Sequence, residues 1–394
     1  MKNVYIIGGA RTPFGKFGGS LKDVSATELG VIASKAALEN SNLTAELVDN
    51  VVVGNVIHTA KNSSYIARHI ALNTGVPIES PALTLNRLCG SGLQAVISAA
   101  QSIKLGESSV GLAVGTENMS QSPHVLRDTR FGTGLKSPQI DDMLWATLTD
   151  EYIGSGMGVT AENLSEKYEI TRQEQDEFAL HSQQRALLAK ESGRLKQEIV
   201  PVLIKKKKSK ELSIENDEHI RTNSTIEDFS NLKPAFKQNG TVTAGNASGI
   251  NDGAGAIVLA SESFINQNPM VKPVAKIVSW GLAGVDPGYM GIGPVPAIKQ
   301  ALERAKLTID DIDLFEINEA FAAQYLAVEK ELGLDRERVN INGGAIAYGH
   351  PVGASGARIL NSLAIDLINQ KKKYGVASLC IGGGQGIAMI IEAV

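Results

Sequence analysis

The sequence contains two cysteines, and the first lies where a thiol could act as a nucleophile. Cys89 stands in the run NRLCGSG, residues 86–92, directly before an apolar helical pattern. At a helix N-terminus, unpaired N–H groups and the positive end of the dipole stabilise a thiolate. The glycines allow a sharp turn, and the N–H of Cys89 could hold an oxyanion. The alternative is a buried structural cysteine, the commoner fate of a lone thiol.

A general base for this thiol is offered by the run GGAIAYGHPVGASG, residues 343–356. His350 is wedged between Gly349 and Pro351 on a glycine-rich turn before a helical pattern, which would fix an imidazole in place. Cysteine nucleophiles that are activated by a base need such a partner. The other five histidines stand in ordinary polar or helical contexts and are expected at the surface or in packing: His58, His69, His124, His181 and His219.

Two further runs could support the same chemistry. In LCIGGGQG, residues 379–386, a strand ends at Cys380 and small residues expose N–H groups that could cradle an oxyanion. The rival is a phosphate-binding turn, but the Gly-Lys-Ser/Thr of a P-loop is missing. In INEAFA, residues 317–322, Asn318 could present its amide to a water or carbonyl, or could simply cap a helix. No Cys or His pair has metal-ligand spacing, so no metal site is predicted.

These residues must be positioned by strands and helices. Short Val/Ile-rich runs alternate with helical patterns along the sequence, which is typical of an α/β protein. The expected strands are Val4–Ile7, Asn50–Val53, Val110–Val114, Val274–Val278, Asp313–Ile317 and Gly375–Leu379. The expected helices are Ala26–Asn40, Gly92–Leu105, Arg172–Ser192, Ala297–Ala305, Ala320–Leu332 and Gly356–Ile368.

An internal repeat organises these elements. The run Ala-Leu-Glu at 37–39 recurs at 301–303, and Ser91-Gly92 recurs as Ser355-Gly356, each 264 residues later (355 minus 91). Two coincidences at one offset favour two related halves over chance similarity. We therefore predict a first half at 1–118, an inserted loop domain at 119–249 that sits over the site, a return and linker at 250–271, and a second half at 272–394.

Composition excludes several other classes of protein. The 394 residues carry a formal net charge of −4, so nothing points to nucleic acid. The lysine run 205–208 is expected to be a solvated loop tip. No apolar stretch approaches the ~20 residues of a membrane span, and two distant cysteines are too few for a disulfide framework. A cytoplasmic protein with reduced thiols is expected.

Taken together, these motifs resemble the thiolases, enzymes that join or cleave 3-ketoacyl-CoA. The resemblance runs from end to end through RTPFG at 11–15, LCGSG at 88–92, ENMS at 117–120 and MGVTAE at 157–162. It continues through TVTAGNASG at 241–249, NEAF at 318–321, GHP at 349–351 and CIGGG at 380–384. It implies a five-layered α/β/α/β/α fold of two duplicated βαβαβ-type halves with an inserted loop domain, which agrees with the repeat.

The resemblance also implies a role for each candidate. Cys89 would take the acyl group after His350 removes its proton, and Cys380 would move a proton at the α-carbon of the second acyl-CoA. The N–H groups of Cys89 and Gly382 would hold the tetrahedral oxyanion, while His350 and, through a water, Asn318 would hold the enolate oxygen. Contacts to CoA are implied for seven residues: Met157, Arg221, Leu232, Phe236, Ala244, Ser248 and Phe321.

Acyl-CoA and CoA are the implied partners, and no metal or redox cofactor is implied. A loop at 127–142 is too long to be idle by ordinary loop lengths. In the thiolases that this chain resembles, a comparable loop links two dimers, so the resemblance implies a homotetramer, with a dimer as fallback. In the better-known biosynthetic members of the family, a histidine often precedes the Met-Gly pair. This sequence departs from that pattern, since Gly156 precedes Met157. Two alternatives are considered. A ketoacyl synthase would lack the second cysteine, and a catalytically silent acyl-CoA-binding relative would have lost one of the catalytic residues.

Overall fold

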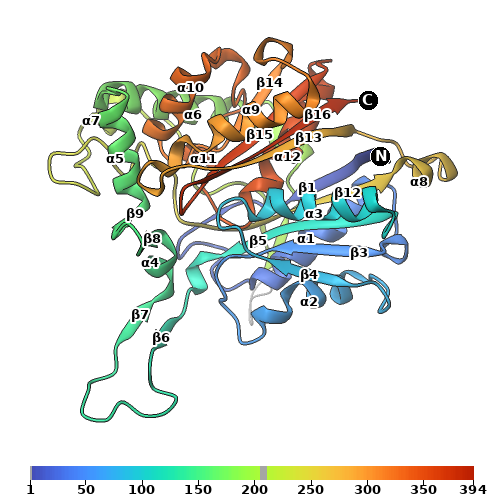
Figure 1. Cartoon of the computed structure of the whole chain (residues 1–394), viewed down its shortest axis with the longest axis horizontal. Coiled ribbons are helices and arrows are strands. Elements are labelled where there is room, and N and C mark those ends of the chain that lie inside the picture. Colours follow the sequence, from blue (N-terminus) through green and yellow to red (C-terminus); the bar gives the residue numbers. More distant parts are fainter. Residues whose placement is uncertain (1, 205–210) are drawn as a thin grey trace.

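The molecule consists of five layers, helix, sheet, helix, sheet and helix, as the sequence predicted (Figure 1). The computed structural model describes residues 2–204 and 211–394. In the middle layer, α3 (Ser91–Leu105) and α12 (Ser355–Asn369) pack in one apolar core with strands from both halves. The outer layers hold α1 (Ala26–Asn40) and α2 (Ile66–Thr74) on one side, and α9 (Pro294–Ala305) and α10 (Ala322–Leu332) on the other.

The strands of the first half lie in the order β1-β12-β5-β3-β4. The pairs β1·β12 and β12·β5 are antiparallel, whereas β5·β3 and β3·β4 are parallel. Parallel neighbours need a crossover, which α2 and α3 provide. The bounds are β1 Val4–Arg11, β3 Asn50–Gly54, β4 Ala82–Leu85, β5 Val110–Asn118 and β12 Asn251–Ser261, and the short β2 (Gly15–Lys16) pairs with β12.

The second half repeats this order as β13-β16-β15-β14, with the same strand directions. A parallel bridge from Phe315 to Val339 stands where the first half has β4. The halves join edge to edge where Tyr5 and Ile6 pair with Lys276 and Ala275. The bounds are β13 Ala275–Gly284, β14 Leu314–Ile317, β15 Tyr374–Ile381 and β16 Gln385–Ala393.

Local contacts follow the repeat residue by residue. The Asp49 carboxylate accepts hydrogen bonds from the N–H groups of Ser109 and Val110 at 2.7 and 3.1 Å. The carboxylate of Asp313 does the same for Lys373 and Tyr374, both at 2.9 Å. Each pair of residues is related by the same offset that relates the starts of α3 and α12. The predicted duplication is therefore confirmed.

The two middle helices meet at their N-terminal ends because both carry glycine there. A Cβ atom on Gly92 would lie 2.7 Å from the nitrogen of Ala357, and one on Gly356 would lie 2.3 Å from the nitrogen of Leu93. No larger residue fits at either position without a backbone shift. The turn that precedes each helix is thereby brought to the centre of the molecule.

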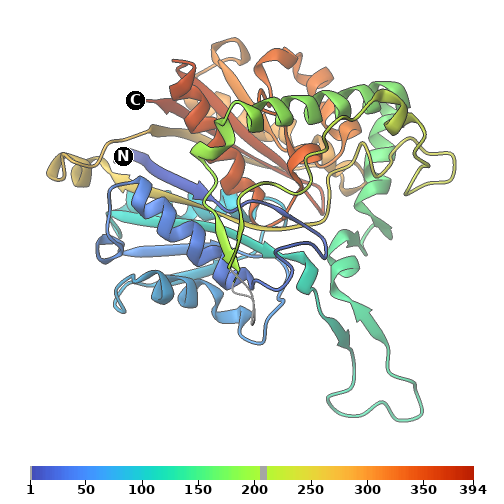
Figure 2. The ribbon, with the colours of Figure 1, turned by 180° about the vertical axis from the view of Figure 1, so that it is seen from behind.

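Residues between β5 and β12 form a separate group of elements. A hairpin of β6 (His124–Leu126) and β7 (Ile140–Asp142) projects away from the layered body in both views (Figure 1, Figure 2). The other elements are α4 Met143–Leu148, β8 Thr149–Asp150, β9 Ser155–Gly156, α5 Met157–Lys167, α6 Arg172–Glu191, β10 Val202–Ile204, β11 Leu212–Ile214 and α7 Ile226–Ser230. The lysine run 205–208 lies outside the described residues.

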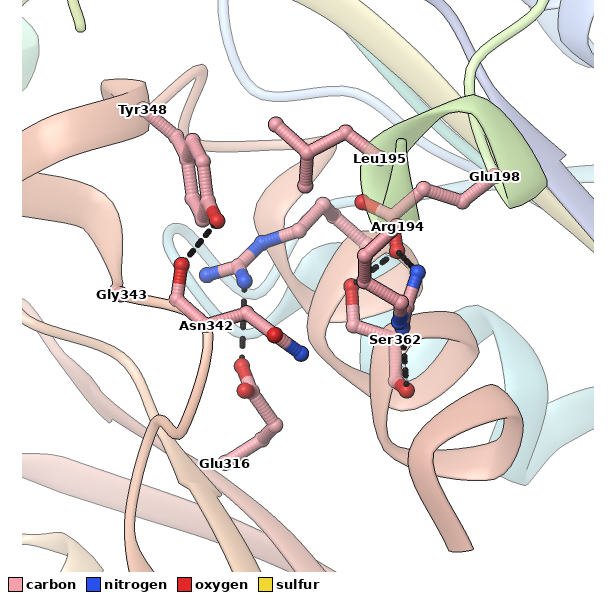
Figure 3. A pocket seen from close by; sticks show the side chains of 9 residues that line it. Arg194, Leu195, Glu198, Glu316, Asn342, Gly343, Tyr348 and Ser362 are labelled. Atoms are coloured by element: carbon pink, nitrogen blue, oxygen red, sulfur yellow. Dashed lines mark hydrogen bonds and ion pairs between the residues drawn. The ribbon is translucent and has the colours of Figure 1, made fainter. Parts of the chain in front are cut away.

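A buried network of charges fastens this group to the second half (Figure 3). Arg194 of the inserted elements binds Asp366 of the second half at 2.5 Å, and Glu198 accepts a hydrogen bond from the Ser362 hydroxyl of the second half at 2.8 Å. Burying these charges would be costly without partners. Removing one member would leave the opposite charge buried and unpaired. We infer that the network fixes where the inserted elements sit over the second half.

The sequence misplaced a few elements. The strand β16 was not predicted, because it follows a glycine turn that reads as loop. The expected return and linker at 250–271 contains the strand β12 and the helix α8 (Glu262–Gln267), whose first turn is capped by the Ser261 hydroxyl. Helix α10 begins two residues later than predicted, because Phe321 is extended. The remaining short helices are η1 Ala45–Leu47, η2 Ser63–Tyr65, η3 Met119–Gln121, η4 Arg194–Gln197, η5 Pro287–Ile292, η6 Ile309–Asp311, η7 Arg336–Arg338 and α11 Ala345–Tyr348.

Candidate active site

One cavity of about 540 Å³ brings most of the predicted site residues together, and its wall is mostly apolar. Ligand sites commonly combine such a wall with a few polar groups. The wall is formed by both halves and by the inserted elements. Of the predicted residues, it includes Cys89, Met157, Arg221, Phe236, Ala244, Ser248, Phe321, His350 and Cys380.

Cys89 stands on a tight turn that ends β4 and begins α3. Leu88 has a φ of +45°, a conformation that side chains rarely adopt, so the turn is strained. Local hydrogen bonds hold it: the Asn86 side chain accepts from the Leu88 N–H at 2.8 Å. The Ser91 hydroxyl accepts from the Arg87 N–H and donates to the Leu88 carbonyl, both at 2.8 Å. The turn presents the Cys89 thiol, half-buried, to the cavity.

The surroundings of Cys89 push its ionisation in two directions. Burial raises the pKa of the thiol to about 11, and the negative charge of Glu117 adds to this rise. The N–H groups of Gly382 and of Cys89 itself lower the pKa, because both point to the sulfur. A resting thiol therefore needs a base to remove its proton, and two N–H groups already stand beside the sulfur.

His350 has a defined tautomer. Its Nδ1 atom lies 2.6 Å from the Ser355 hydroxyl, which donates its own hydrogen to the Pro351 carbonyl at 3.1 Å. The hydroxyl can then only accept from the ring, so Nδ1 carries the proton. Nε2 is left with a lone pair, and the Asn318 amide nitrogen, a donor, lies 3.4 Å away. The ring faces the cavity with its basic nitrogen unprotonated.

The backbone around His350 is held as firmly as the ring. The His350 N–H donates to the Asn251 side chain at 3.1 Å, and Asn251 in turn donates to the Gly15 carbonyl at 2.9 Å. Gly349 has a φ of +98°, and a Cβ atom there would lie 2.2 Å from Asn251 Cγ. Burial, reinforced by the charge of Arg358, lowers the pKa of His350 to about 4, so the imidazole is neutral near pH 7.

Cys380 is the next-to-last residue of β15, and Gly382 begins the turn that joins β15 to β16. Cys380 is 1% exposed, and burial together with the charge of Cys89 raises its pKa above the ordinary range. The turn itself passes through Gly383 and Gly384, with φ of +78° and +79°, which favours glycine. The Gly382 N–H points to the sulfur of Cys89. The second cysteine is therefore a protonated thiol beside the first.

Asn318 and Leu232 do not form part of the cavity wall. Asn318 is fully buried behind His350, and its Oδ1 atom has no hydrogen-bond partner among the described residues. Buried oxygens usually have one. Leu232, expected at CoA, lies behind the turn at Gly245, where a Cβ atom would be 2.6 Å from its Cδ1. Phe236 and Phe321, also expected at CoA, do face the cavity, and their rings pack edge to face with centroids 6.0 Å apart.

Sequence reasoning missed Glu117, a buried residue that joins the turns of both halves. Its carboxylate accepts from the N–H groups of Val56 and Ile57 at 3.0 Å and from that of Gly353 at 3.1 Å. Burial raises its pKa to about 8. These partners are distant in sequence, so only the fold reveals the contact.

His219 was expected in packing or at the surface, but it lines the cavity, and burial lowers its pKa to about 4. The nearby charges of Arg221 and Lys16 reinforce that shift. No local motif distinguishes His219 from the other four histidines. In residues 2–204 and 211–394, no group of three or more His, Cys, Asp or Glu side chains could hold a metal ion. Nor does any helix there have the length and apolarity to cross a membrane.

Known proteins agree with this architecture over the whole chain. Residues 4–263 match the thiolase N-terminal domain and residues 271–393 the thiolase C-terminal domain. The chain is 49% identical to the human mitochondrial 3-ketoacyl-CoA thiolase over 394 residues, which cover 100% of this chain and 99% of the relative. It is 50% identical to an acetyl-CoA acetyltransferase of Syntrophomonas wolfei over 397 residues, with coverage of 100% and 99%.

Solved structures give the same answer. The human mitochondrial 3-ketoacyl-CoA thiolase in complex with CoA has a TM-score of 0.96 at 48% identity, with 100% of this chain and 98% of that chain covered. The Bacillus anthracis acetyl-CoA acetyltransferase has a TM-score of 0.97 at 48% identity, with coverage of 100% and 99%. The chain therefore belongs to the thiolase family of acyltransferases.

Proposed function

We propose that this thiolase transfers acyl groups between CoA thioesters through an acyl group on Cys89, cleaving 3-ketoacyl-CoA with CoA or condensing two acyl-CoA molecules. One observation carries the proposal. Cys89 and His350 come from two turns and Cys380 from the end of strand β15, and all three side chains line one cavity. A structural role for the thiols would not require a neutral, oriented imidazole beside them.

In the first half-reaction, Nε2 of His350 takes the proton of the Cys89 thiol. The thiolate attacks the thioester carbonyl, and the negative charge that forms on oxygen needs hydrogen-bond donors. The N–H groups of Cys89 and Gly382 serve this purpose, since both favour negative charge at this point and so lower the pKa of the Cys89 thiol. Collapse of the tetrahedral intermediate releases CoA, which takes the proton back, and leaves acyl-Cys89.

In the second half-reaction, a carbon–carbon bond forms. His350 first takes the thiol proton of Cys380, and the Cys380 thiolate then removes a proton from the α-carbon of the second acyl-CoA. The resulting enolate attacks the acyl carbon on Cys89. The tetrahedral intermediate collapses by breaking its C–S bond, and the Cys89 thiolate that leaves takes the proton back from His350. While His350 holds the proton taken from Cys380, its Nε2–H and a water held by Asn318 donate hydrogen bonds to the enolate oxygen. The free Oδ1 atom of Asn318 supports this, because it can accept a hydrogen bond from such a water. Thiolysis is the same sequence reversed.

Binding of CoA falls to the six predicted contacts in the wall: Met157, Arg221, Phe236, Ala244, Ser248 and Phe321. Arg221 supplies a positive charge for the phosphates, and the apolar side chains supply surface for the pantetheine arm. No metal or redox cofactor is needed for either half-reaction. Fatty acid metabolism is the fitting context for a 3-ketoacyl-CoA substrate, and cytoplasmic location stays a prediction, because the human relative is named mitochondrial.

We also propose a homotetramer, with a dimer as fallback. The hairpin β6–β7 extends from the body and exposes large apolar side chains, with Phe131 97% and Ile140 66% exposed. Such surface on a protruding arm fits a subunit contact. Light scattering that shows a monomer would contradict both states.

The acyl-enzyme is tested by incubating the protein with acetyl-CoA and locating the added acetyl group by peptide mass spectrometry. We expect it on Cys89, and we expect Cys89→Ala to lose both the modification and all turnover. Cys380→Ala serves as the matched control, because it removes the other thiol and should still be acetylated. Modification at another residue, with Cys89 untouched, would refute the proposal.

A further inference from the structure

We propose that Glu117 is a positioning residue of this enzyme, whose carboxylate holds the turn that carries His350 at its place beside Cys89. This inference rests on the proposed function, in which His350 takes the proton of the Cys89 thiol. It goes further, because Glu117 does not line the cavity and so acts only through the segments that it binds.

The Glu117 carboxylate is surrounded by hydrogen-bond donors from both halves of the chain. Its Oε1 atom accepts from the Ile57 N–H at 3.0 Å and from the Asn55 side chain at 3.2 Å. Its Oε2 atom accepts from the Val56 N–H at 3.0 Å and from the Gly353 N–H at 3.1 Å. The side chain is fully buried. One of its oxygens therefore joins a segment of the first half to a turn of the second half.

Both of the segments that Glu117 joins lie beside the nucleophile. Val56 and Ile57 belong to an apolar cluster that packs against Cys89. Val352, from the turn of the second half, belongs to the same cluster. A displacement of the carboxylate would therefore move the surroundings of the thiol and the turn of its base relative to each other.

The turn that carries His350 lacks the side-chain hydrogen bonds that hold the turn of Cys89. In the Cys89 turn, the side chains of Asn86 and Ser91 each accept from a backbone N–H group of the turn. At the matching positions of the second half stand His350 and Ser355, whose side chains contact each other instead. The orientation of the imidazole thus uses both side chains that could otherwise have held this turn.

Glu117 supplies a hydrogen bond to this turn from outside. Gly353 follows His350 by three positions, and a Cβ atom on Gly353 would lie 2.6 Å from the accepting oxygen of Glu117. The turn can come this close only with glycine. At the position that matches Glu117, the second half carries Ile381, so the turn of Cys89 receives no such carboxylate. The external bond is therefore present only for the turn that carries the base.

The test measures the single-turnover rate at which acetyl-CoA acetylates Cys89, and the acetyl-CoA concentration that half-saturates this rate. In Glu117→Ala, we expect the rate to fall ~10–100-fold, because a misplacement of about 1 Å can cost as much as ~100-fold. The half-saturating concentration should change little, because Glu117 does not line the cavity. Glu117→Gln keeps the shape and one acceptor oxygen, so its rate should lie between those of Glu117→Ala and the wild type.

Asp313→Ala is the matched control. It also removes the acceptor of backbone N–H groups, but at the opposite end of β15 from Cys380. This variant shows what a loss of stability alone does to the rate, and we expect acetylation at close to the wild-type rate.

Several results would overturn the inference while leaving the proposed function intact. Both Glu117 variants could be acetylated at the wild-type rate, could change only the half-saturating concentration, or could lose no more of the rate than Asp313→Ala. Failure of both Glu117 variants to fold would make Glu117 a structural residue, which also contradicts the inference. A wild type that is never acetylated at Cys89 would instead overturn the proposed function.

Discussion

At matching positions 264 residues apart, the first half carries Cys89 where the second half carries Gly353, and Thr116 where the second carries Cys380. The strand order and the starts of α3 and α12 are the same in both halves. What differs is the chemistry placed on a shared frame. In the proposed mechanism, one half supplies the acyl carrier, and the other supplies both proton-moving groups.

The serines at the two helix starts show how one position acquires two uses. Ser91 accepts from the N–H of Arg87 and so secures the strained turn that presents Cys89. Ser355, at the matching position, instead contacts Nδ1 of His350 and so sets which ring nitrogen is basic. The close crossing at Gly92 and Gly356 then brings both turns to one place. A duplicated fold thus yields an asymmetric site.

The largest effect on this division of roles should come from removing the base. His350→Ala should lower the rates of acyl transfer and of condensation by roughly 10²–10⁴-fold, the usual contribution of a placed general base. Burial lowers the pKa of His350 to about 4, so it is deprotonated at higher pH. The acid limb of wild-type kcat/KM should therefore lie well below pH 6.5. A limb near pH 6.5, or a variant that transfers acetyl at the wild-type rate, would argue against His350 as the base.

A smaller effect, on the free energy of unfolding, should show that equivalent contacts stabilise both halves to the same extent. Asp49→Ala and Asp313→Ala each remove the acceptor of two backbone N–H groups, at equivalent positions where a β-strand begins. Each should lower the free energy of unfolding by about 1–3 kcal/mol, and the two losses should be similar. Urea unfolding measures both, with acetoacetyl-CoA turnover as a check that the site is preserved. A large loss in one variant and none in the other would contradict equivalent halves.

Much of this arrangement could be predicted from the sequence. The repeat predicted the duplicated fold, and the glycine-flanked Cys89, His350 and Cys380 were placed in one site because their local motifs are specific. Glu117 and Asn251 could not be found, because their partners Gly353 and His350 lie 236 and 99 residues away. Leu232 packs behind the turn at Gly245 and outside the cavity wall, which no local pattern reveals, and its contact with CoA stays a prediction.

The central claim is that Cys89 carries the acyl group and Cys380 only moves the α-proton. It is tested most directly in Cys380→Ser, by following acetylation of Cys89 and deuterium exchange at the α-carbon of acetyl-CoA in the same preparation. A serine hydroxyl is a far poorer acid–base group than a thiol with an ordinary pKa of about 8.5. We predict that Cys89 is still acetylated, that deuterium exchange collapses, and that condensation falls by about 10²–10⁴-fold. Exchange and condensation at near wild-type rates would make Cys380 structural and contradict the account.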